Sequence, residues 1–336
     1  MSTQRQQSGQ IWIGILISLV SIALILLFID PIDILTGLQS VQLSFVGLMA
    51  LGLIVFLILR AIRWQFMLTE GTPWRSVYHI QNIGYMFNMT LPFRIGDVAR
   101  AMLIGNVPPS TLSGGLSTMV VERLFDMLFV VTLLPFTLTA VASLPTWMQA
   151  GAQFFGYASI TGILILIIAA NQRPFATRTA GSILGRIPKI NAAPWVTRLD
   201  NFLEGLSSLT NLKSGATLIL LSILVWLPVL YTYFIGMRAF GIEPTAVQVG
   251  FLFCAAALSV TAPSAPGGIG VFHLGVTGAM LAMGQSNEHA TALAVVYHAI
   301  NLLTMVVMGI IGLSRLNTTF AQVIQSARAF RNREKQ

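Results

Sequence analysis

The chain reads NMTLPFRIGDVAR at positions 88–100 and APSAPGGIGVFH at positions 262–273, and each segment interrupts an otherwise apolar run. In a bilayer, broken backbone persists only where it is buried in protein or lines a cavity. One such segment in each half of a chain is the best sequence indicator of a transport site. The segments predict a polytopic membrane protein that moves a polar lipid or a lipid-linked substrate. The helix breakers are Pro92, Gly96, Pro263 and Pro266.

The composition agrees with a membrane protein. Of the 336 residues, 55% are hydrophobic and only 9% are charged, whereas soluble domains carry about 25% charge. The net charge of +8 is attributed to basic cytoplasmic loops that face anionic lipid headgroups. We therefore expect no nucleic-acid partner. Cys254 is the only cysteine, which excludes a disulfide within one chain.

Eight apolar runs predict membrane crossings in one all-α membrane bundle that spans residues 1–336. Arg60 and Arg63 are interpreted as the end of the second run. Residues 83–118 are too apolar for a loop and too broken for a simple crossing, which favours a re-entrant hairpin or two half-helices. The eight runs are 11–29, 43–59, 127–144, 154–170, 217–237, 247–261, 271–283 and 290–313.

Basic residues predict the orientation. Residues 60–75, the connector 171–215, the N-terminus and the tail 316–336 contain Lys or Arg, whereas loops 30–42, 145–151 and 284–289 contain none. The positive-inside rule then predicts an inner-membrane protein with both termini in the cytoplasm. Within the connector, an amphipathic pattern through Trp195 and Leu199 indicates a helix on the membrane surface or packed on the cytoplasmic side of the bundle.

Charged groups inside apolar segments are the first candidate site, because each costs about 2.5–3.5 kcal/mol at the bilayer centre on insertion scales. A helix that begins near Gly96 puts Asp97 and Arg100 on one face and Arg94 just before its start, which suits an anion such as a lipid phosphate. The alternative is a structural salt bridge from Asp97 to Arg100. The candidates in this group are Asn88, Arg94, Asp97 and Arg100.

The second candidate group is Glu122, Arg123 and Asp126. Glu122 and Asp126 share a helix face, so a cation is needed between them. Arg94, Arg100 or a substrate amine could supply it. The alternative is a cytoplasmic helix start, where acids interact favourably with the helix dipole.

The third candidate group is Gly267, Gly268 and Gly270, followed by His273. Backbone N–H groups of such a turn can hold a phosphate; the alternative is a kinked helix packed closely on a neighbour. His273 could titrate near neutral pH or be a hydrogen-bonded structural residue. Pro92 and Gly96 have the same spacing as Pro266 and Gly270, as an inverted repeat would produce.

Catalytic motifs are absent: the chain has no nucleotide loop, HExxH or GxSxG element. We therefore expect no catalytic residue, no cofactor and no bound metal, and we classify the protein as a non-enzyme. The expected partner is a membrane lipid substrate, and a second copy of the chain or a lipid-synthesis enzyme remains open.

Three motifs resemble those of a known family. Residues 88–100 resemble N-x-x-x-P-x-R-x-G-[DE]-x-x-R, STMVVERLFD at 117–126 resembles S-x-x-x-x-E-R-x-x-D, and APGGIGVF at 265–272 resembles P-G-G-x-G. The chain thereby resembles the lysylphosphatidylglycerol synthase transmembrane, or flippase-like, family, which includes the translocase half of the multiple peptide resistance factor. The resemblance implies a helical bundle with re-entrant elements and a lipid-facing cavity. It also implies movement of an aminoacylated phospholipid, with the first two candidate groups along the headgroup path.

Two departures leave the substrate open. The family often has Glu where this chain has His273, and the chain ends soon after its last predicted crossing, so we expect it not to synthesise a lysyl lipid itself. Hopanoids, glycolipids and polyprenyl-phosphate carriers remain candidates. The alternatives to a translocase are a membrane enzyme with Glu122 or Asp97 as base, and a non-transporting accessory protein of lipid synthesis.

Overall fold

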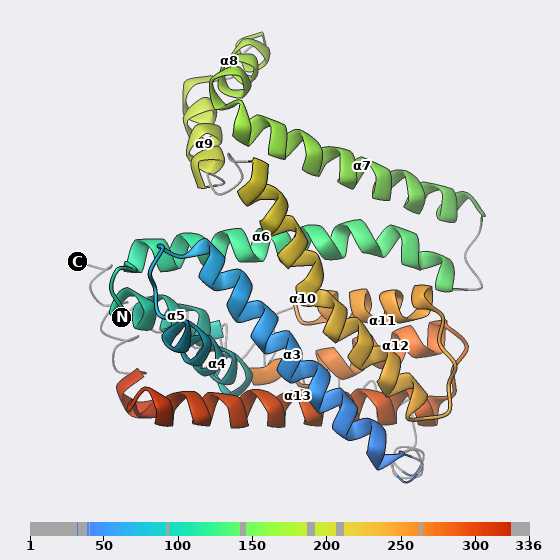
Figure 1. The fold of residues 1–336 in the computed structure, drawn as a ribbon. Helices are drawn as coiled ribbons and strands as arrows, with labels where there is room; N and C mark the ends of the chain where they lie inside the picture. The colour runs from blue at the N-terminus through green and yellow to red at the C-terminus, as the bar shows by residue number, and fades with distance from the viewer. Residues whose placement is uncertain are drawn as a thin grey trace, which may run out of the picture.

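The computed structural model describes residues 32, 39, 41–91, 94–141, 146–186, 192–205, 212–261 and 265–323. These residues form helices and no strand, which confirms the predicted all-α class (Figure 1). The predicted crossing 11–29, Pro92, Pro263 and most of the basic tail lie outside them. The helices are α3 (Leu43–Met67), α4 (Trp74–Thr90), α5 (Ile95–Gly105), α6 (Leu112–Thr137), α7 (Thr146–Asn171), α8 (Arg173–Leu184), α9 (Ala192–Gly205), α10 (Leu212–Arg238), α11 (Ala246–Ser259), α12 (Val271–Ala282) and α13 (Asn287–Arg315).

The order of elements repeats along the chain. A long helix, two short helices separated by a break, and a second long helix occur as α3–α6 and again as α10–α13. The first helices of the two halves are antiparallel neighbours: Gln42, before α3, donates its backbone N–H to Ala239 after α10, and Met67 at the other end of α3 packs near Leu218. This arrangement matches the predicted inverted repeat.

The short helices form two hairpins. In the first, Gly84 of α4 and Gly96 of α5 touch so closely that a Cβ on Gly96 would overlap the Gly84 carbonyl oxygen. The second hairpin consists of α11 and α12, and a single 3₁₀ turn, η4 (Pro266–Gly268), precedes α12. The predicted break within 83–118 lies between α4 and α5, but α4 begins earlier than predicted, at Trp74, and α6 begins within the same stretch, at Leu112.

The second hairpin corrects the predicted number of crossings. The runs 247–261 and 271–283 are predicted as two crossings, but α11 has 14 residues and α12 has 12. At 1.5 Å per residue each is about 20 Å long, which is too short for a core about 30 Å thick. Among the described helices, the segments long and apolar enough to cross are Leu43–Met67, Lys213–Arg238 and Asn287–Arg315. Helix α6 has the length, with 26 residues, but carries three charged side chains.

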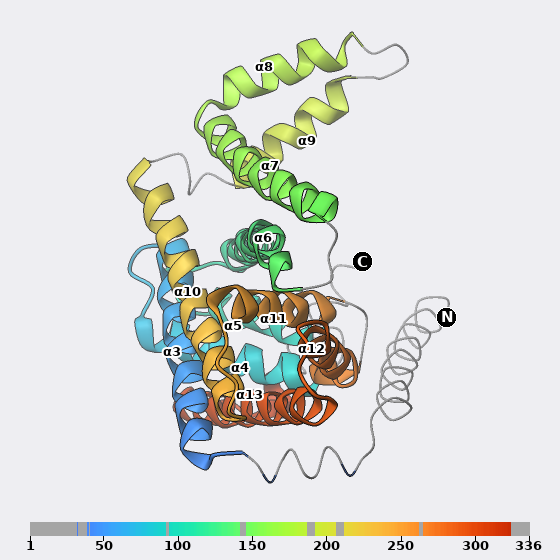
Figure 2. The same ribbon diagram turned by 90° about the vertical axis from the view of Figure 1, so that its right-hand side faces the viewer.

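Helices α7, α8 and α9 lie outside the two halves. Helix α7 runs beside α6. Helices α8 and α9 project from the C-terminal end of α7 (Figures 1 and 2). Arg173 of α8 pairs with Asp200 of α9 at 3.0 Å. In the predicted amphipathic connector, Leu199 packs beside Leu218 at the start of α10, while Trp195 stays exposed. Leu199 thus fits a helix packed on the bundle.

Candidate functional site: a buried charge network

Helix α3 supplies two arginines that the sequence interpretation placed at its end. The helix instead continues to Met67 and buries Arg60 and Arg63 almost completely. Arg60 lies seven residues before the helix end, which is about 10 Å along the axis. The predicted helix end is therefore wrong. The signal that was missed is the apolar sequence after Arg63, which includes Trp64, Phe66 and Met67.

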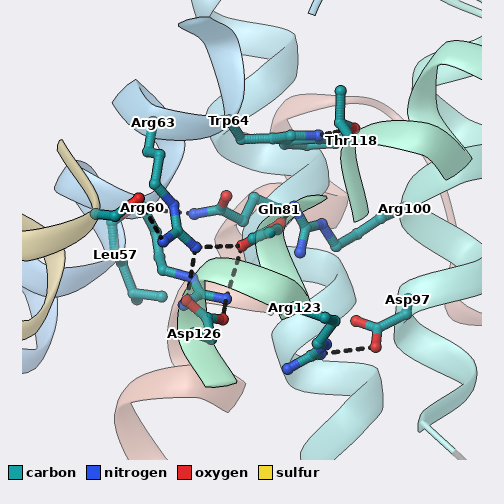
Figure 3. A network of polar contacts seen from close by, with 12 residues as sticks. Leu57, Arg60, Arg63, Trp64, Gln81, Asp97, Arg100, Thr118, Arg123 and Asp126 are labelled. Atoms are coloured by element: carbon teal, nitrogen blue, oxygen red, sulfur yellow. Dashed lines mark hydrogen bonds and ion pairs between the residues drawn. The ribbon is translucent and has the colours of Figure 1, made fainter. Parts of the chain in front are cut away.

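Three arginines converge on two acids of α6 (Figure 3). The carboxylate of Glu122 lies 2.7 Å from Arg60, 3.4 Å from Arg63 and 3.0 Å from Arg100. Asp126 lies 2.9 Å from both Arg60 and Arg63. Of the cations considered for these acids, Arg100 pairs with Glu122, and Arg60 and Arg63 are the partners that sequence reasoning missed. We call these five residues the inner cluster.

Aromatic rings surround the inner cluster. The guanidinium carbon of Arg60 is 5.6 Å from the ring centres of Phe56, Tyr85 and Trp226, and that of Arg100 is 4.2 Å from the Trp64 ring. Such cation–π contacts stabilise a cation that has lost its water. Burying charges costs several kcal/mol each, and ion pairing and hydrogen bonds must offset this cost. The rings and acids together explain how arginines can persist inside the bundle.

A second charged group lies where the first hairpin meets α6. Asp97 accepts a hydrogen bond from Asn88 at 3.0 Å and an ion-paired one from Arg123 at 2.7 Å, which links α4, α5 and α6. Arg94, the residue before α5, adopts a left-handed conformation and donates to the Val260 carbonyl at 3.3 Å. The alternative salt bridge from Asp97 to Arg100 does not form, because Arg100 binds Glu122. Asn88, Arg94, Asp97 and Arg123 form the outer group.

The two groups together carry surplus positive charge. The inner cluster has three arginines and two acids, and the outer group has two arginines and one acid. Five positive charges thus face three negative ones, and each group separately has one positive charge in excess. The surplus of the inner cluster is buried and is expensive unless an anion balances it, whereas Arg94 of the outer group is exposed.

The predicted third group lies at the tip of the second hairpin. Gly267, Gly268 and Gly270 all have positive φ angles, between 70° and 87°, which L-residues with side chains rarely adopt. The Gly270 N–H donates to His273 Nδ1 at 3.3 Å, and the His273 ring stacks on His298 with centres 4.8 Å apart. His298 is a further residue that sequence reasoning did not select.

The tips of the two hairpins meet. Arg94 reaches Val260 at the end of α11, and a Cβ on Gly267 would lie 3.0 Å from the carbonyl oxygen of Met89 in α4. The two broken segments of the sequence are therefore neighbours in space. Among the described residues, no group of three or more His, Cys, Asp or Glu side chains is arranged to hold a metal ion.

Two helical hairpins that meet inside a bundle, beside buried charges, define a multi-pass α-helical membrane protein. The model of the lysylphosphatidylglycerol synthase TM region matches residues 11–309, so the chain belongs to that family, as its motifs indicated. The chain is thereby a lipid-related membrane protein.

Two curated relatives are archaeal. Glycosyltransferase AglD of Haloferax volcanii is 24% identical over 364 residues, which cover 96% of this chain and 57% of that protein. A UPF0104 membrane protein of Methanothermobacter thermautotrophicus is 25% identical over 308 residues, covering 88% of this chain and 90% of the relative. The chain thus spans little more than half of AglD. No solved structure matches the chain significantly.

Proposed function

We propose that this chain moves a phosphate-bearing lipid, or another lipid-linked substrate with an anionic headgroup, between the leaflets of the membrane. The observation that carries this proposal is the buried surplus of one positive charge in the inner cluster, with a second surplus charge beside it in the more exposed outer group. An unbalanced charge at membrane depth costs about 2.5–3.5 kcal/mol on insertion scales. A bound phosphate would offset that cost, and the planar guanidinium of arginine suits phosphate oxygens.

Two neutral donors beside the inner cluster fit the same ligand. The Tyr85 hydroxyl and the Trp226 Nε1 are buried and have no hydrogen-bond partner within the described part of the chain. Both rings lie against Arg60. Buried polar groups are usually paired, so these atoms are candidate contacts for oxygens of a headgroup, which includes those of an aminoacylated phospholipid.

The topology that the basic residues predict gives each hairpin a direction. With both termini in the cytoplasm, the connection from α3 to α4 lies on the cytoplasmic side and the connection from α10 to α11 on the opposite side. The hairpin α4–α5 then enters from the cytoplasmic leaflet and α11–α12 from the other. Their meeting tips would lie between the leaflets, where a headgroup must pass.

A membrane enzyme acting on a lipid-linked sugar is the second candidate, and the name of AglD favours it. A general base must reach the proton that it removes. Asp97, Glu122 and Asp126 are each held by at least one arginine within 3.0 Å. These acids are engaged as ion-pair partners, which fits a binding role better than proton abstraction.

The test compares lipid movement in proteoliposomes for the wild type and Arg94→Ala, using headgroup-labelled phospholipids and an impermeant quencher. Arg94 donates its hydrogen bond to a backbone carbonyl, so Arg94→Ala breaks no ion pair with a carboxylate among the described residues. We expect the wild type to move anionic phospholipid and Arg94→Ala to lose most of that activity while remaining folded.

The matched control is Arg238→Ala, which removes an arginine from an exposed ion pair with Glu243. It should move lipid at the wild-type rate. Wild-type protein that moves no phospholipid, glycolipid or polyprenyl phosphate would contradict the proposal. Sugar transfer by such protein would instead favour the enzyme.

A further inference from the structure

Half of the net charge of the chain lies in the connector between α7 and α10. Residues 171–215 contain six basic residues and two acidic ones, a net charge of +4 against +8 for the whole chain. Both acidic residues, Asp200 and Glu204, belong to α9, so α8 carries only positive charge. Because basic connections mark the cytoplasmic side of a membrane protein, α8 and α9 are expected on that side.

The end of α7 locates the membrane surface relative to α8. Ile165 and Ile168 of α7 are exposed, so this helix presents an apolar surface suited to acyl chains as far as its last turn. Polar and basic residues follow at once, at Asn171, Gln172 and Arg173. Such a change marks the boundary between acyl chains and headgroups. Helix α8 begins at this boundary and lies crosswise to α7, together with α9 (Figure 2).

One side of α8 is packed against the rest of the protein. Ala176 lies against a cluster that includes Leu218 of α10, and a Cβ on Gly181 would lie 3.5 Å from the Val196 side chain of α9. These contacts fix how α8 is rotated about its own axis. The side of α8 opposite to them is therefore held outward.

The outward side of α8 combines apolar and basic side chains. Phe175 and Ile183 are 68% and 57% exposed, and with Thr179 they form one row at steps of four residues. Arg178 and Arg186 each follow one of the two apolar residues by three positions, and both are exposed. Large apolar side chains flanked by arginines are typical of helices that bind anionic membrane surfaces. We call Phe175, Arg178, Thr179, Ile183 and Arg186 the arm face.

We propose that the arm face docks on the anionic cytoplasmic surface of the membrane that surrounds the bundle. Phe175 and Ile183 insert where acyl chains meet headgroups, and the two arginines pair with anionic headgroups. Two observations select this occupant. The arm face begins where the lipid-facing surface of α7 ends, and its charge is opposite to that of the cytoplasmic leaflet. The inference concerns residues outside the inner cluster and outer group and does not rest on lipid movement.

The experiment measures contact between α8 and lipid with a nitrobenzoxadiazole fluorophore attached to Thr179→Cys of the full chain. The native Cys254 is buried, which directs the fluorophore to the introduced cysteine. The protein is reconstituted into vesicles of phosphatidylcholine with or without phosphatidylglycerol. A fraction of the phosphatidylcholine carries a nitroxide on its acyl chain near the headgroup, and it quenches a fluorophore that touches the membrane. Both leaflets contain every lipid, so the orientation of insertion does not affect the result.

We expect quenching at position 179 to be several-fold stronger in vesicles that contain phosphatidylglycerol. Roughly 1 M salt shortens the Debye length to about 3 Å and should remove this difference. Replacing both arginines, by Arg178→Gln and Arg186→Gln, should also remove it. Phe175→Ser should weaken quenching in both kinds of vesicle, because the inserted ring is lost.

The matched control is Ile310→Cys in α13, an exposed position on the bundle itself. Its fluorophore should be quenched equally with and without phosphatidylglycerol, and an unchanged value in each arm-face variant shows that the variant is still inserted.

Three results would overturn the inference. No quenching at position 179 in either kind of vesicle would place the arm face in water. Equal quenching with and without phosphatidylglycerol would show that the arginines do not recognise anionic lipid. Protection of the fluorophore from water without quenching by the lipid nitroxide would assign the face to a protein, such as a second copy of the chain. None of these results bears on the proposed function, because lipid movement is measured separately.

Discussion

The two halves of the molecule have the same order of helices but opposite chemistry at corresponding positions. Glu122 and Arg123 are the tenth and eleventh residues after the start of α6, and both form ion pairs. Tyr297 and His298 are the tenth and eleventh after the start of α13. Tyr297 stacks on Tyr233 with ring centres 4.2 Å apart, and His298 stacks on His273.

The comparison separates what the fold requires from what the chemistry requires. The second half builds its hairpin and long helices around aromatic and imidazole rings, so this arrangement of helices does not depend on buried ion pairs. Buried ion pairs are weak evidence for stability, because desolvation can exceed the Coulombic gain. This arrangement of helices therefore does not by itself require the charges in α3, α5 and α6.

The largest expected difference in stability between the halves follows substitution of Glu122 in the first half and of Tyr297 in the second. Glu122→Gln removes a charge that three arginines share, and breaking a buried pair in this way costs about 3–5 kcal/mol. Tyr297→Phe keeps the stacked ring and should cost about 1 kcal/mol. Unfolding of both purified variants, followed by tryptophan fluorescence in detergent, measures the contrast. Equal losses of stability in the two variants would show that the fold depends no more on the inner cluster than on the stacked tyrosines.

An intermediate effect is expected where the helices of the first hairpin touch. Gly96→Ala forces a Cβ against the Gly84 carbonyl oxygen, which is backbone and cannot rotate away, and overpacking of this kind costs about 1–3 kcal/mol. Gly278→Ala in α12 meets nothing within 4 Å and should stabilise its helix by about 0.5–1 kcal/mol. Shifts of the unfolding midpoint in opposite directions for the two variants would sharpen the comparison. A Gly96→Ala variant as stable as the wild type would refute the close approach of Gly84 and Gly96.

The smallest effect is expected at His298. Its Nε2 is buried without a hydrogen-bond partner in the part of the chain that the structure describes, so His298→Leu loses no hydrogen bond at that atom and should change stability by less than about 1 kcal/mol. Arg63→Leu in the first half should cost more, because Asp126 loses a partner at 2.9 Å. Thermal unfolding of the two variants decides this point, and a larger loss for His298→Leu would indicate an unrecognised partner.

Local sequence predicted the hairpins better than the crossings. Pro92, Gly96, Pro266 and Gly270 marked both breaks, because proline and glycine act on the backbone within a few residues. The runs 247–261 and 271–283 were predicted as crossings because apolar composition does not distinguish a short buried helix from a spanning one. Only the observed lengths of α11 and α12, 14 and 12 residues, show that these runs form short helices.

The candidate site was predicted only in part for a related reason. Asp97, Arg100, Glu122, Arg123 and Asp126 stood out because ionised groups are rare in apolar segments. Arg60 and Arg63 match the sequence pattern of a helix end, since a basic residue after an apolar run usually marks the membrane surface. Their burial depends on α6 and α10, which lie far away in the sequence.

The sequence by itself determined the membrane class, the two broken segments and the charged residues of their apolar surroundings, because each depends on composition or on spacing within one turn of helix. The tertiary structure decided which charges meet. It paired Asp97 with Arg123 instead of Arg100, and brought Arg60 and Arg63 to Glu122. It also joined the two hairpin tips through Arg94 and Val260. Pairings of this kind depend on how distant helices pack, and no local pattern encodes that packing.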